Sequence, residues 1–367
     1  MRLFDPFLYE KVHELIILAF VLYYFAHMQH KNAVQLVFRK NTMHVLILYA
    51  LLYMIVIGLR PVSFAFGDTT VYAKGYEDFS VMLEMGSFSR DSLFYSFMWV
   101  CSHFMSVHWF FLLVEVLYIV PIIIGCSRLL KKNIDVGLLF CFSAFSFFSY
   151  SVNGIRNGMA LSLVFLAITF IQGNIINKII CAILSFIAIS IHASAALPVA
   201  CMLAAYLIKN PHLMFYFWAF SIVISLIGGN AVTNLFAGLG FDDRITDYIH
   251  PDIEEDLYTD TGFRWDFLIY SAAPILLGWY VVFKRRVFDS SYLLLLGTYI
   301  FANAFWIMVI RAEFSNRFAY LSWFLYPLVL AYPLLNLKIW PKTQGRKAAV
   351  IMAAHYAFTF IMVFFLK

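Results

Sequence analysis

Long apolar stretches separated by short polar segments recur from one end of the chain to the other. Many of them approach the length of about 20 residues that a helix needs to cross the hydrocarbon core of a bilayer. They do not alternate between apolar and polar positions, as the strands of a membrane barrel do. The pattern therefore predicts an all-α polytopic integral membrane protein with a single transmembrane domain over residues 1–367. About twelve transmembrane helices are expected, near residues 12–28, 43–59, 109–126, 135–150, 157–172, 177–191, 195–208, 212–228, 267–283, 291–309, 318–336 and 348–366.

One further apolar segment, 92–107 (SLFYSFMWVCSHFMSV), has two interpretations, and the basic residues decide between them. If this segment crossed the membrane, the basic loop at 128–133 would face the opposite side from the basic loop at 30–41. If it lies flat on the outer surface as an interfacial helix, both loops face the cytoplasm, together with those at 284–286 and 337–347. We therefore expect an outer N-terminus and two long periplasmic loops, at 60–108 and 229–266.

The composition agrees with a membrane protein. Hydrophobic residues make up 63% of the chain and charged residues 13%, whereas about a quarter of the residues in a soluble domain are charged. The net charge of +5 comes with basic residues in short loops between spans, which predicts orientation in a membrane and no nucleic-acid partner. The five cysteines lack pairing or metal-ligand spacing and are expected to pack in apolar surroundings.

The second long loop is acidic, and its aromatic residues favour an ordered cap over an unstructured segment. It holds nine of the 21 carboxylates of the chain: Asp242, Asp243, Asp247, Asp252, Glu254, Glu255, Asp256, Asp260 and Asp266. A loop of this length in a compact protein is usually functional or disordered.

Several ionisable residues gather at the expected outer rim, on segments that are far apart in the sequence. A single arginine at the end of a span commonly extends to the interface, and the pair Gly154 and Gly158 around Arg156 is typical of helix packing. Four separate outer segments nevertheless contribute arginine, against the positive-inside trend. The rim residues are Asp68, Arg156, His192, Arg244, Arg264, Arg311 and Arg317.

Arginine presents a planar fork of donors that matches phosphate and does not lose its charge. An outer cavity that holds several arginines would suit a lipid-linked phosphate or pyrophosphate. Glu115 lies inside the third span, where a carboxylate is costly unless it is paired or functional. Supporting roles are expected for Glu115, Asn157, Glu313 and Tyr72.

Several segments resemble the Wzy/EpsG-like membrane polymerases of bacterial surface polysaccharides, the O-antigen polymerase group. YSVNGIRNGMALSLVFLAITFI and FIAISIHASAALPVACML are similar to the central motifs of that family. GDTTVYAKGYEDF and RDSLFYSFMW resemble its first outer loop, and GFRWDFLIYSAAP and NRFAYLSWFLYPLVL its closing segments. The resemblance covers about residues 60–335, and Asn157 stands where glutamine is usual.

This resemblance implies a GT-C-like glycosyltransferase of the bacterial inner membrane, with its active site facing the periplasm. The donor would be a growing glycan on undecaprenyl pyrophosphate, and the acceptor a single lipid-linked repeat unit. No metal and no cofactor are implied. The product would be a lipopolysaccharide O-antigen or an exopolysaccharide, and partners could include membrane lipid and a chain-length regulator protein.

The chemistry assigns roles to the rim residues. Preorganised cations would stabilise the charge that develops on the leaving pyrophosphate, with Arg156, Arg264 and Arg317 preferred over Arg244 and Arg311. The acceptor hydroxyl needs a base close to its oxygen. Asp68 is the first candidate for the catalytic base and His192 is its rival.

Two other functions stay open at this point. An O-antigen ligase would share the architecture and differ in its acceptor. A flippase or transporter of lipid-linked oligosaccharides should carry polar residues at the centres of its spans, and most span centres here are apolar.

Overall fold

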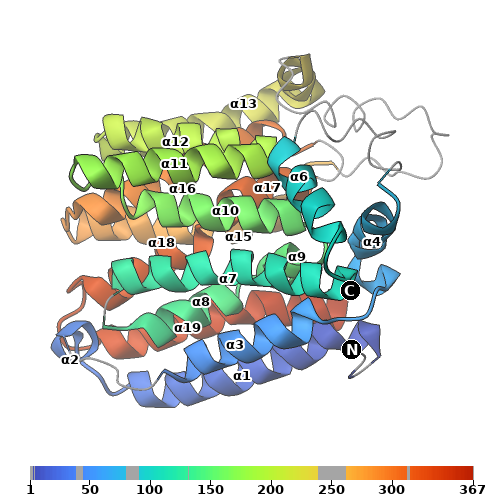
Figure 1. Cartoon of the computed structure of the whole chain (residues 1–367). Helices are drawn as coiled ribbons and strands as arrows, with labels where there is room; N and C mark the ends of the chain where they lie inside the picture. Colours follow the sequence, from blue (N-terminus) through green and yellow to red (C-terminus); the bar gives the residue numbers. More distant parts are fainter. Residues whose placement is uncertain are drawn as a thin grey trace. The chain divides into compact units, whose positions relative to one another are not determined.

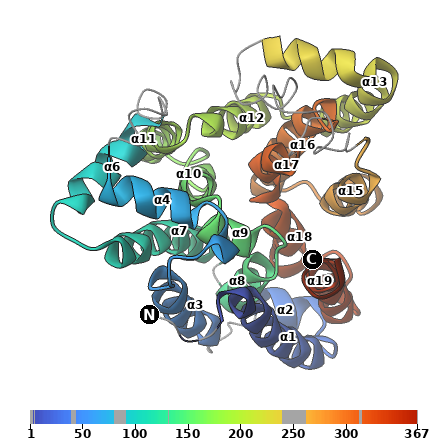
Figure 2. The same cartoon turned by 90° about the vertical axis from the view of Figure 1, so that its right-hand side faces the viewer.

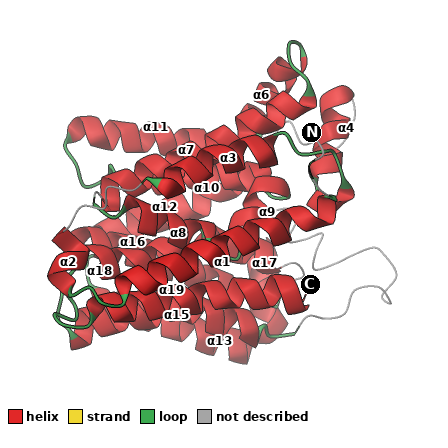
Figure 3. Ribbon diagram, turned by 90° about the horizontal axis from the view of Figure 1, so that it is seen from below, coloured by secondary structure: helices red, strands yellow, loops and turns green. Residues whose placement is uncertain are grey.

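The structure consists of helices and their connections, and no strand occurs in the part of the chain that it describes (Figure 3). It is a computed structural model. The structure describes residues 3, 5–38, 44–79, 91–130, 132–238, 262–311 and 315–366, and of residues 38, 229–238 and 316 it describes the backbone alone.

Seven helices of the described chain are long and apolar enough to cross a membrane. They cover Pro6–Met28, Val107–Leu130, Pro211–Gly228, Trp265–Lys284, Ser290–Met308, Arg317–Asn336 and Gln344–Leu366. Shorter apolar helices cover Val45–Gly58, Ser92–Ser102, Ile155–Ile168, Ile175–Ile191 and Ala193–Leu207. The prediction of an all-α multi-pass membrane protein is confirmed, whereas the count of twelve spans, the GT-C-like arrangement and the orientation stay predictions.

Two expected spans are interrupted in the structure. The span 318–336 forms α17 (Ser315–Trp323) and α18 (Tyr326–Asn336), with a turn at 324–325. The segment 135–150 forms two short helices, α8 (Ile134–Phe142) and α9 (Phe147–Val152), with a turn between them. The hydroxyl of Ser143 donates to the carbonyl of Leu139 at 2.7 Å and lies 3.2 Å from that of Phe140. Serine hydroxyls that bond the preceding turn bend or end helices, which accounts for the break.

The contacts within the chain group it into two compact units. The first unit comprises Met1–Ala195 and Leu330–Lys367, and the second comprises Ala196–Val329. Each unit is described by itself below.

The first unit packs long helices side by side and carries two short helices at one end. Its long helices α7, α10 and α11 run alongside one another (Figure 1). Figure 2 views the end where α4 and α6 lie. Its helices are α1 (Tyr9–Met28), α2 (Ala33–Phe38), α3 (Val45–Gly58), α4 (Thr69–Glu77), α6 (Ser92–Ser102), α7 (Val107–Leu130), α8, α9, α10 (Ile155–Ile168), α11 (Ile175–Ile191) and α19 (Gln344–Ile361).

Small residues set how closely the helices of the first unit approach. A side chain at Gly158 would bring its Cβ within 2.8 Å of the carbonyl oxygen of Tyr150, so α10 can pack on the end of α9 only with glycine here. Gly154 has no such contact: its nearest neighbours would lie 3.9 Å away, and it serves as the N-cap of α10. The packing role expected for this glycine pair therefore falls on Gly158.

The second unit is built around the buried helix α16 (Ser290–Met308), whose polar side chains bond to its neighbours. Asn303 accepts from the indole of Trp218 at 2.9 Å and donates to Ser322 at 3.2 Å. Tyr299 donates to the carbonyl of Ser271 at 2.9 Å. The other helices are α12 (Ala196–Leu207), α13 (Pro211–Gly238), α15 (Trp265–Trp279) and α17 (Ser315–Trp323), and α18 (Tyr326–Asn336) runs from this unit into the first.

Candidate functional site

Arg156 lies in the first turn of α10 and is the centre of a polar cluster at one end of the first unit. Its Nε donates to the hydroxyl of Tyr72 at 3.1 Å, and its Nη1 donates to the hydroxyl of Tyr95 at 2.8 Å. The same Nη1 makes a short, charge-assisted bond to Oδ2 of Asp91. Partners from α4 and α6 therefore hold the guanidinium on α10 in one orientation.

Asp91 is the N-cap residue of α6 and the hub of this cluster. Its Oδ2 also accepts from Nδ1 of His192 at 3.1 Å, and its Oδ1 accepts from the backbone N–H of Ala193 at 2.9 Å. The residue is buried, with 4% of its surface exposed. The carboxylate thus joins α6, α10 and the end of α11 through three donors.

Two opposing effects act on the charge of Asp91. Burial by itself raises the pKa of the Asp91 carboxyl, because a charge is poorly solvated inside a protein. The hydrogen bond and charge of His192, the charge of Arg156 and the N–H of Ala193 outweigh that effect and hold the pKa well below its ordinary value. Asp91 is therefore ionised at neutral pH.

His192 ends α11, where the chain turns from helical to extended backbone, and it is buried. Because Nδ1 faces a carboxylate, it carries the proton, and in the neutral ring the lone pair lies on Nε2. The small residue Ala193 lets Oδ1 of Asp91 reach the backbone directly. This orientation by a carboxylate is the one that prepares a histidine to act as a base.

Asp68, the first candidate base, lies at the start of α4 in the same unit. Its backbone N–H donates to the side-chain oxygen of Asn153 at 2.9 Å, and its side chain makes no capping bond. Gly67 has a φ of 58°, and a side chain there would also collide with Asn153. Gly67 and Asp68 therefore form a tight turn that packs against Asn153.

Arg156 has one nitrogen that no described residue engages. Nε and Nη1 are occupied as above, whereas Nη2 makes no hydrogen bond within the described chain, and 18% of the side chain is exposed. The neighbouring Asn157 carries a buried side-chain oxygen that also accepts no bond from the described residues. At the head of α10, Nη2 of Arg156 and the side-chain oxygen of Asn157 therefore have no hydrogen-bond partner among the described residues.

Tyr72, which accepts from Nε of Arg156, is buried. Burial raises the pKa of its phenol, although the charge of Arg156 acts in the opposite direction. The phenol is therefore neutral and can accept the N–H of Arg156.

Glu115, which the sequence places deep in a span, is paired. It is fully buried on α7, and its Oε1 lies 3.7 Å from Nη1 of Arg60, which is also buried. Arg60 follows α3 and lies over the ring of Phe111 at 4.6 Å.

The second unit holds three of the expected arginines. Arg264 forms a two-pronged pair with Asp266, at 3.0 and 2.7 Å, and lies 3.9 Å from the ring of Phe267. Arg311 lies 5.6 Å from the ring of Phe263, and its Nε is buried without a bond from the described residues. Arg317 is exposed on the first turn of α17. Arg244 and Glu313 lie outside the described residues.

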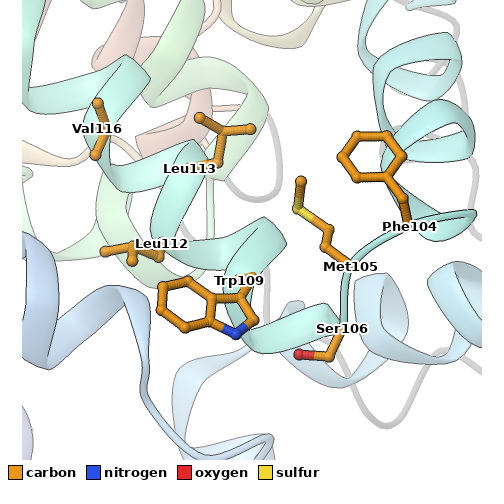
Figure 4. Close-up of a pocket in the computed structure, with 7 residues that line it drawn as sticks. All are labelled: Phe104, Met105, Ser106, Trp109, Leu112, Leu113 and Val116. Atoms are coloured by element: carbon orange, nitrogen blue, oxygen red, sulfur yellow. The ribbon is translucent and has the colours of Figure 1, made fainter.

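An apolar hollow of about 650 Å³ opens beside the first turns of α7. Figure 4 shows Trp109, Leu112, Leu113 and Val116 along α7, facing the connection from α6 that carries Phe104, Met105 and Ser106. Ser106 is the one hydroxyl-bearing residue of this lining. Within the described chain, no three His, Cys, Asp or Glu side chains are grouped to hold a metal ion.

Comparison with known families now decides the class of the protein. The model of the EpsG family matches residues 42–367, which is most of the chain and includes the whole Arg156 cluster. The chain belongs to the EpsG family. This is a family of Wzy-like polysaccharide polymerases and glycosyltransferases, so this chain is of the polysaccharide-polymerase type, and the family implies lipid-linked polysaccharide substrates in a membrane. No significant match was found among curated proteins or among solved structures.

Three members of the site escaped sequence reasoning: Asp91, Tyr95 and Arg60. Two of them share a spacing that Asp68 and Tyr72 also have, so the spacing alone does not single them out. Asp91 and Tyr95 are four residues apart at the start of a helix, which puts both on one face. Arg60 gave no local signal, because its partners Thr69 and Glu115 come from two other helices.

Proposed function

We propose that this EpsG-family protein is a polysaccharide polymerase that moves a growing glycan from a polyprenyl pyrophosphate onto a lipid-linked repeat unit. The observation that carries the proposal is the convergence of Arg156, Asp91 and His192 at one end of the first unit. A cation can stabilise the leaving pyrophosphate, and a histidine oriented by a carboxylate can serve as the base.

His192 is the proposed base. Its Nε2 takes the proton of the acceptor hydroxyl while the oxygen forms a bond to the anomeric carbon of the donor sugar. Asp91 keeps the ring in the required tautomer and stabilises the imidazolium that forms. We prefer His192 to Asp68 in this role because Asp91 bonds both His192 and Arg156, whereas no such bond joins the Asp68 side chain to a histidine or arginine among the described residues.

Arg156 acts on the leaving group of the same reaction. As the bond between the anomeric carbon and the pyrophosphate oxygen breaks, the electron pair leaves with the pyrophosphate. Nη2 of Arg156 donates to that oxygen, while Asp91, Tyr72 and Tyr95 keep the guanidinium in place. The exposed part of Arg156 is where such an anion would bind.

The apolar hollow beside α7 supports a lipid-linked substrate. It begins directly after α6, the helix whose first residue follows Asp91, so one short helix joins the charged cluster to an apolar surface. We assign the polyprenyl chain of a substrate to this surface. The cluster would then face the periplasm of a bacterial inner membrane, where undecaprenyl pyrophosphate carries the glycan.

The test is chain extension by the purified protein in lipid vesicles, with lipid-linked repeat units as the only sugar source. The proposal predicts a ladder of lengthening glycans and release of one polyprenyl pyrophosphate for each bond formed. His192→Gln should abolish the ladder at unchanged protein abundance.

Two outcomes would overturn the proposal. Transfer only after a lipid A-core acceptor is added would make the protein a ligase. Movement of intact lipid-linked units across the vesicle membrane without bond formation would make it a flippase.

A further inference from the structure

The buried pair of Arg60 and Glu115 has no part in the chemistry above, although it is costly to build. Both side chains are at most 1% exposed, and the closest charged atoms are 3.7 Å apart. Neither oxygen of Glu115 accepts a hydrogen bond within the described residues. A buried ion pair of loose geometry adds little stability compared with apolar side chains of the same size, so its presence calls for another explanation.

The guanidinium of Arg60 donates hydrogen bonds to one backbone carbonyl and to one side-chain hydroxyl. Its Nη1 donates to the carbonyl of Ile57 at 2.9 Å, and its Nη2 donates to the hydroxyl of Thr69 at 3.1 Å. Ile57 belongs to the last turn of α3, and Thr69 is the first residue of α4. Arg60 therefore ties the start of α4 to the end of α3, and Glu115 is the acidic side chain beside it.

Thr69 also connects the start of α4 to the segment that precedes Arg156 in the chain. Its hydroxyl donates to the carbonyl of Val152 at 2.7 Å, beside the bond between the N–H of Asp68 and Asn153. Tyr72 lies three residues beyond Thr69, so both are on one face of α4. The hydroxyl of Tyr72 accepts from Nε of Arg156 at 3.1 Å.

We propose that Arg60 and Thr69 are positioning residues, which hold α4 against the junction of α9 and α10 so that Tyr72 fixes the guanidinium of Arg156. Glu115 serves this arrangement by neutralising Arg60. The inference rests on the proposed function for its activity readout, and it also makes a structural claim that is independent of the reaction.

The first test compares Thr69→Val with Thr69→Ser by chain extension in vesicles. Valine keeps the shape of the side chain and removes the hydroxyl that joins Arg60 to Val152. We expect kcat to fall about tenfold with little change in KM, as for the loss of one hydrogen bond to a charged group. Serine keeps the hydroxyl and should restore activity to near the wild-type level.

Arg128 and Thr169 offer a matched control within the same unit. Nε of Arg128 donates to the hydroxyl of Thr169 at 2.8 Å, and Arg128 lies 3.7 Å from the ring of Phe170. Both residues lie at the far ends of α7 and α10 from Arg156. Thr169→Val should leave the rate of chain extension unchanged.

A double-mutant cycle separates positioning from general damage. If Thr69 acts through Tyr72, then Thr69→Val should lower the rate of chain extension by a much smaller factor in a Tyr72→Phe background than in the wild type. Independent losses that multiply would overturn the proposal, even if each variant were impaired alone.

Hydrogen exchange provides the readout that does not depend on the reaction. Thr69→Val and Arg60→Lys should speed exchange of the amides of Asp68 and α4, whereas Thr169→Val should not. Unchanged exchange in α4 would overturn the positioning role even in an active polymerase. Faster exchange in a protein that makes no polymer would instead remove the proposed function and leave the structural claim standing.

Discussion

The arginines of the two units differ in where their partners come from. Arg156 of the first unit bonds to Tyr72, Asp91 and Tyr95, which are 84, 65 and 61 residues away in the sequence. Arg264 of the second unit pairs with Asp266, two residues away, on the same turn of the chain. The first arrangement exists only when the fold brings several helices together, whereas the second needs only local structure.

Solvent exposure sharpens this contrast. The side chains of Arg156 and Asp91 are 18% and 6% exposed, and those of Arg264 and Asp266 are 31% and 49% exposed. A charge pair shielded from water interacts more strongly than one that water screens. We therefore expect changes at the Arg156 cluster to have large effects and changes at the Arg264 pair to have small ones.

Among changes at the arginines and their tyrosine partners, the largest effect is expected for Arg156→Ala. Loss of a preorganised donor to the leaving group should slow chain extension on the order of 10²–10³-fold. Arg156→Lys should recover only part of this loss, since an ammonium keeps the charge and loses the fork. Extension rates in vesicles, corrected for the amount of folded protein, measure both variants, and full-length polymer from Arg156→Ala would contradict the assignment.

A smaller loss is expected for Tyr95→Phe. The phenylalanine keeps the ring and removes the hydroxyl that Nη1 of Arg156 contacts at 2.8 Å. The rate should fall on the order of tenfold, as for one hydrogen bond to a charged group. The same assay measures it, with Tyr299→Phe as a control for loss of a buried tyrosine hydroxyl in the second unit. Equal losses in the two variants would indicate general destabilisation.

Arg264→Ala should have a still smaller effect. Its pair with Asp266 is partly exposed, and exposed pairs contribute about 0–1 kcal/mol, which corresponds to less than about fivefold in rate. A loss as large as that of Arg156→Ala would break the comparison between the units and give Arg264 a direct contact with substrate.

The smallest effect concerns stability and pH. Asp91 has a folded pKa below its unfolded value, so its contribution to stability is fully present above about pH 4 and is lost as the pH falls through the folded pKa. Asp91→Asn should lower the melting temperature by about a few degrees at pH 5. The difference should shrink in more acidic buffer. Thermal melts of the purified protein at several pH values measure this, and a difference that grew with acid would have the wrong sign.

The class of fold could be predicted from the sequence because the length of an apolar stretch depends only on residues that follow one another in the chain. The helices at 107–130 and 290–308 are apolar over the length of a span, and both exist. The break between α8 and α9 was not predicted, because Ser143 ends the helix by bonding its own preceding turn within an otherwise apolar run.

The site was predicted in part. Arg156 and His192 stood out because charged or polar residues at the ends of apolar spans are easy to see in a sequence. The carboxylate that joins them did not, because nothing in a linear sequence distinguishes Asp91 from Asp68. Both precede a helix with a tyrosine four residues later. Only the packing of α6 against α11 shows which one reaches the histidine.

The measurement that tests the central claim most directly is therefore a comparison of these two carboxylates. Asp91→Asn and Asp68→Asn make the same chemical change in the segment between α3 and α7, at the starts of α6 and α4. Chain extension by each purified variant in vesicles should separate them. The account predicts a loss on the order of 10²–10⁴-fold for Asp91→Asn, because His192 loses its orienting carboxylate and Arg156 its anchor, and a rate close to wild type for Asp68→Asn. Normal extension by Asp91→Asn together with inactive Asp68→Asn, both at wild-type abundance, would contradict it.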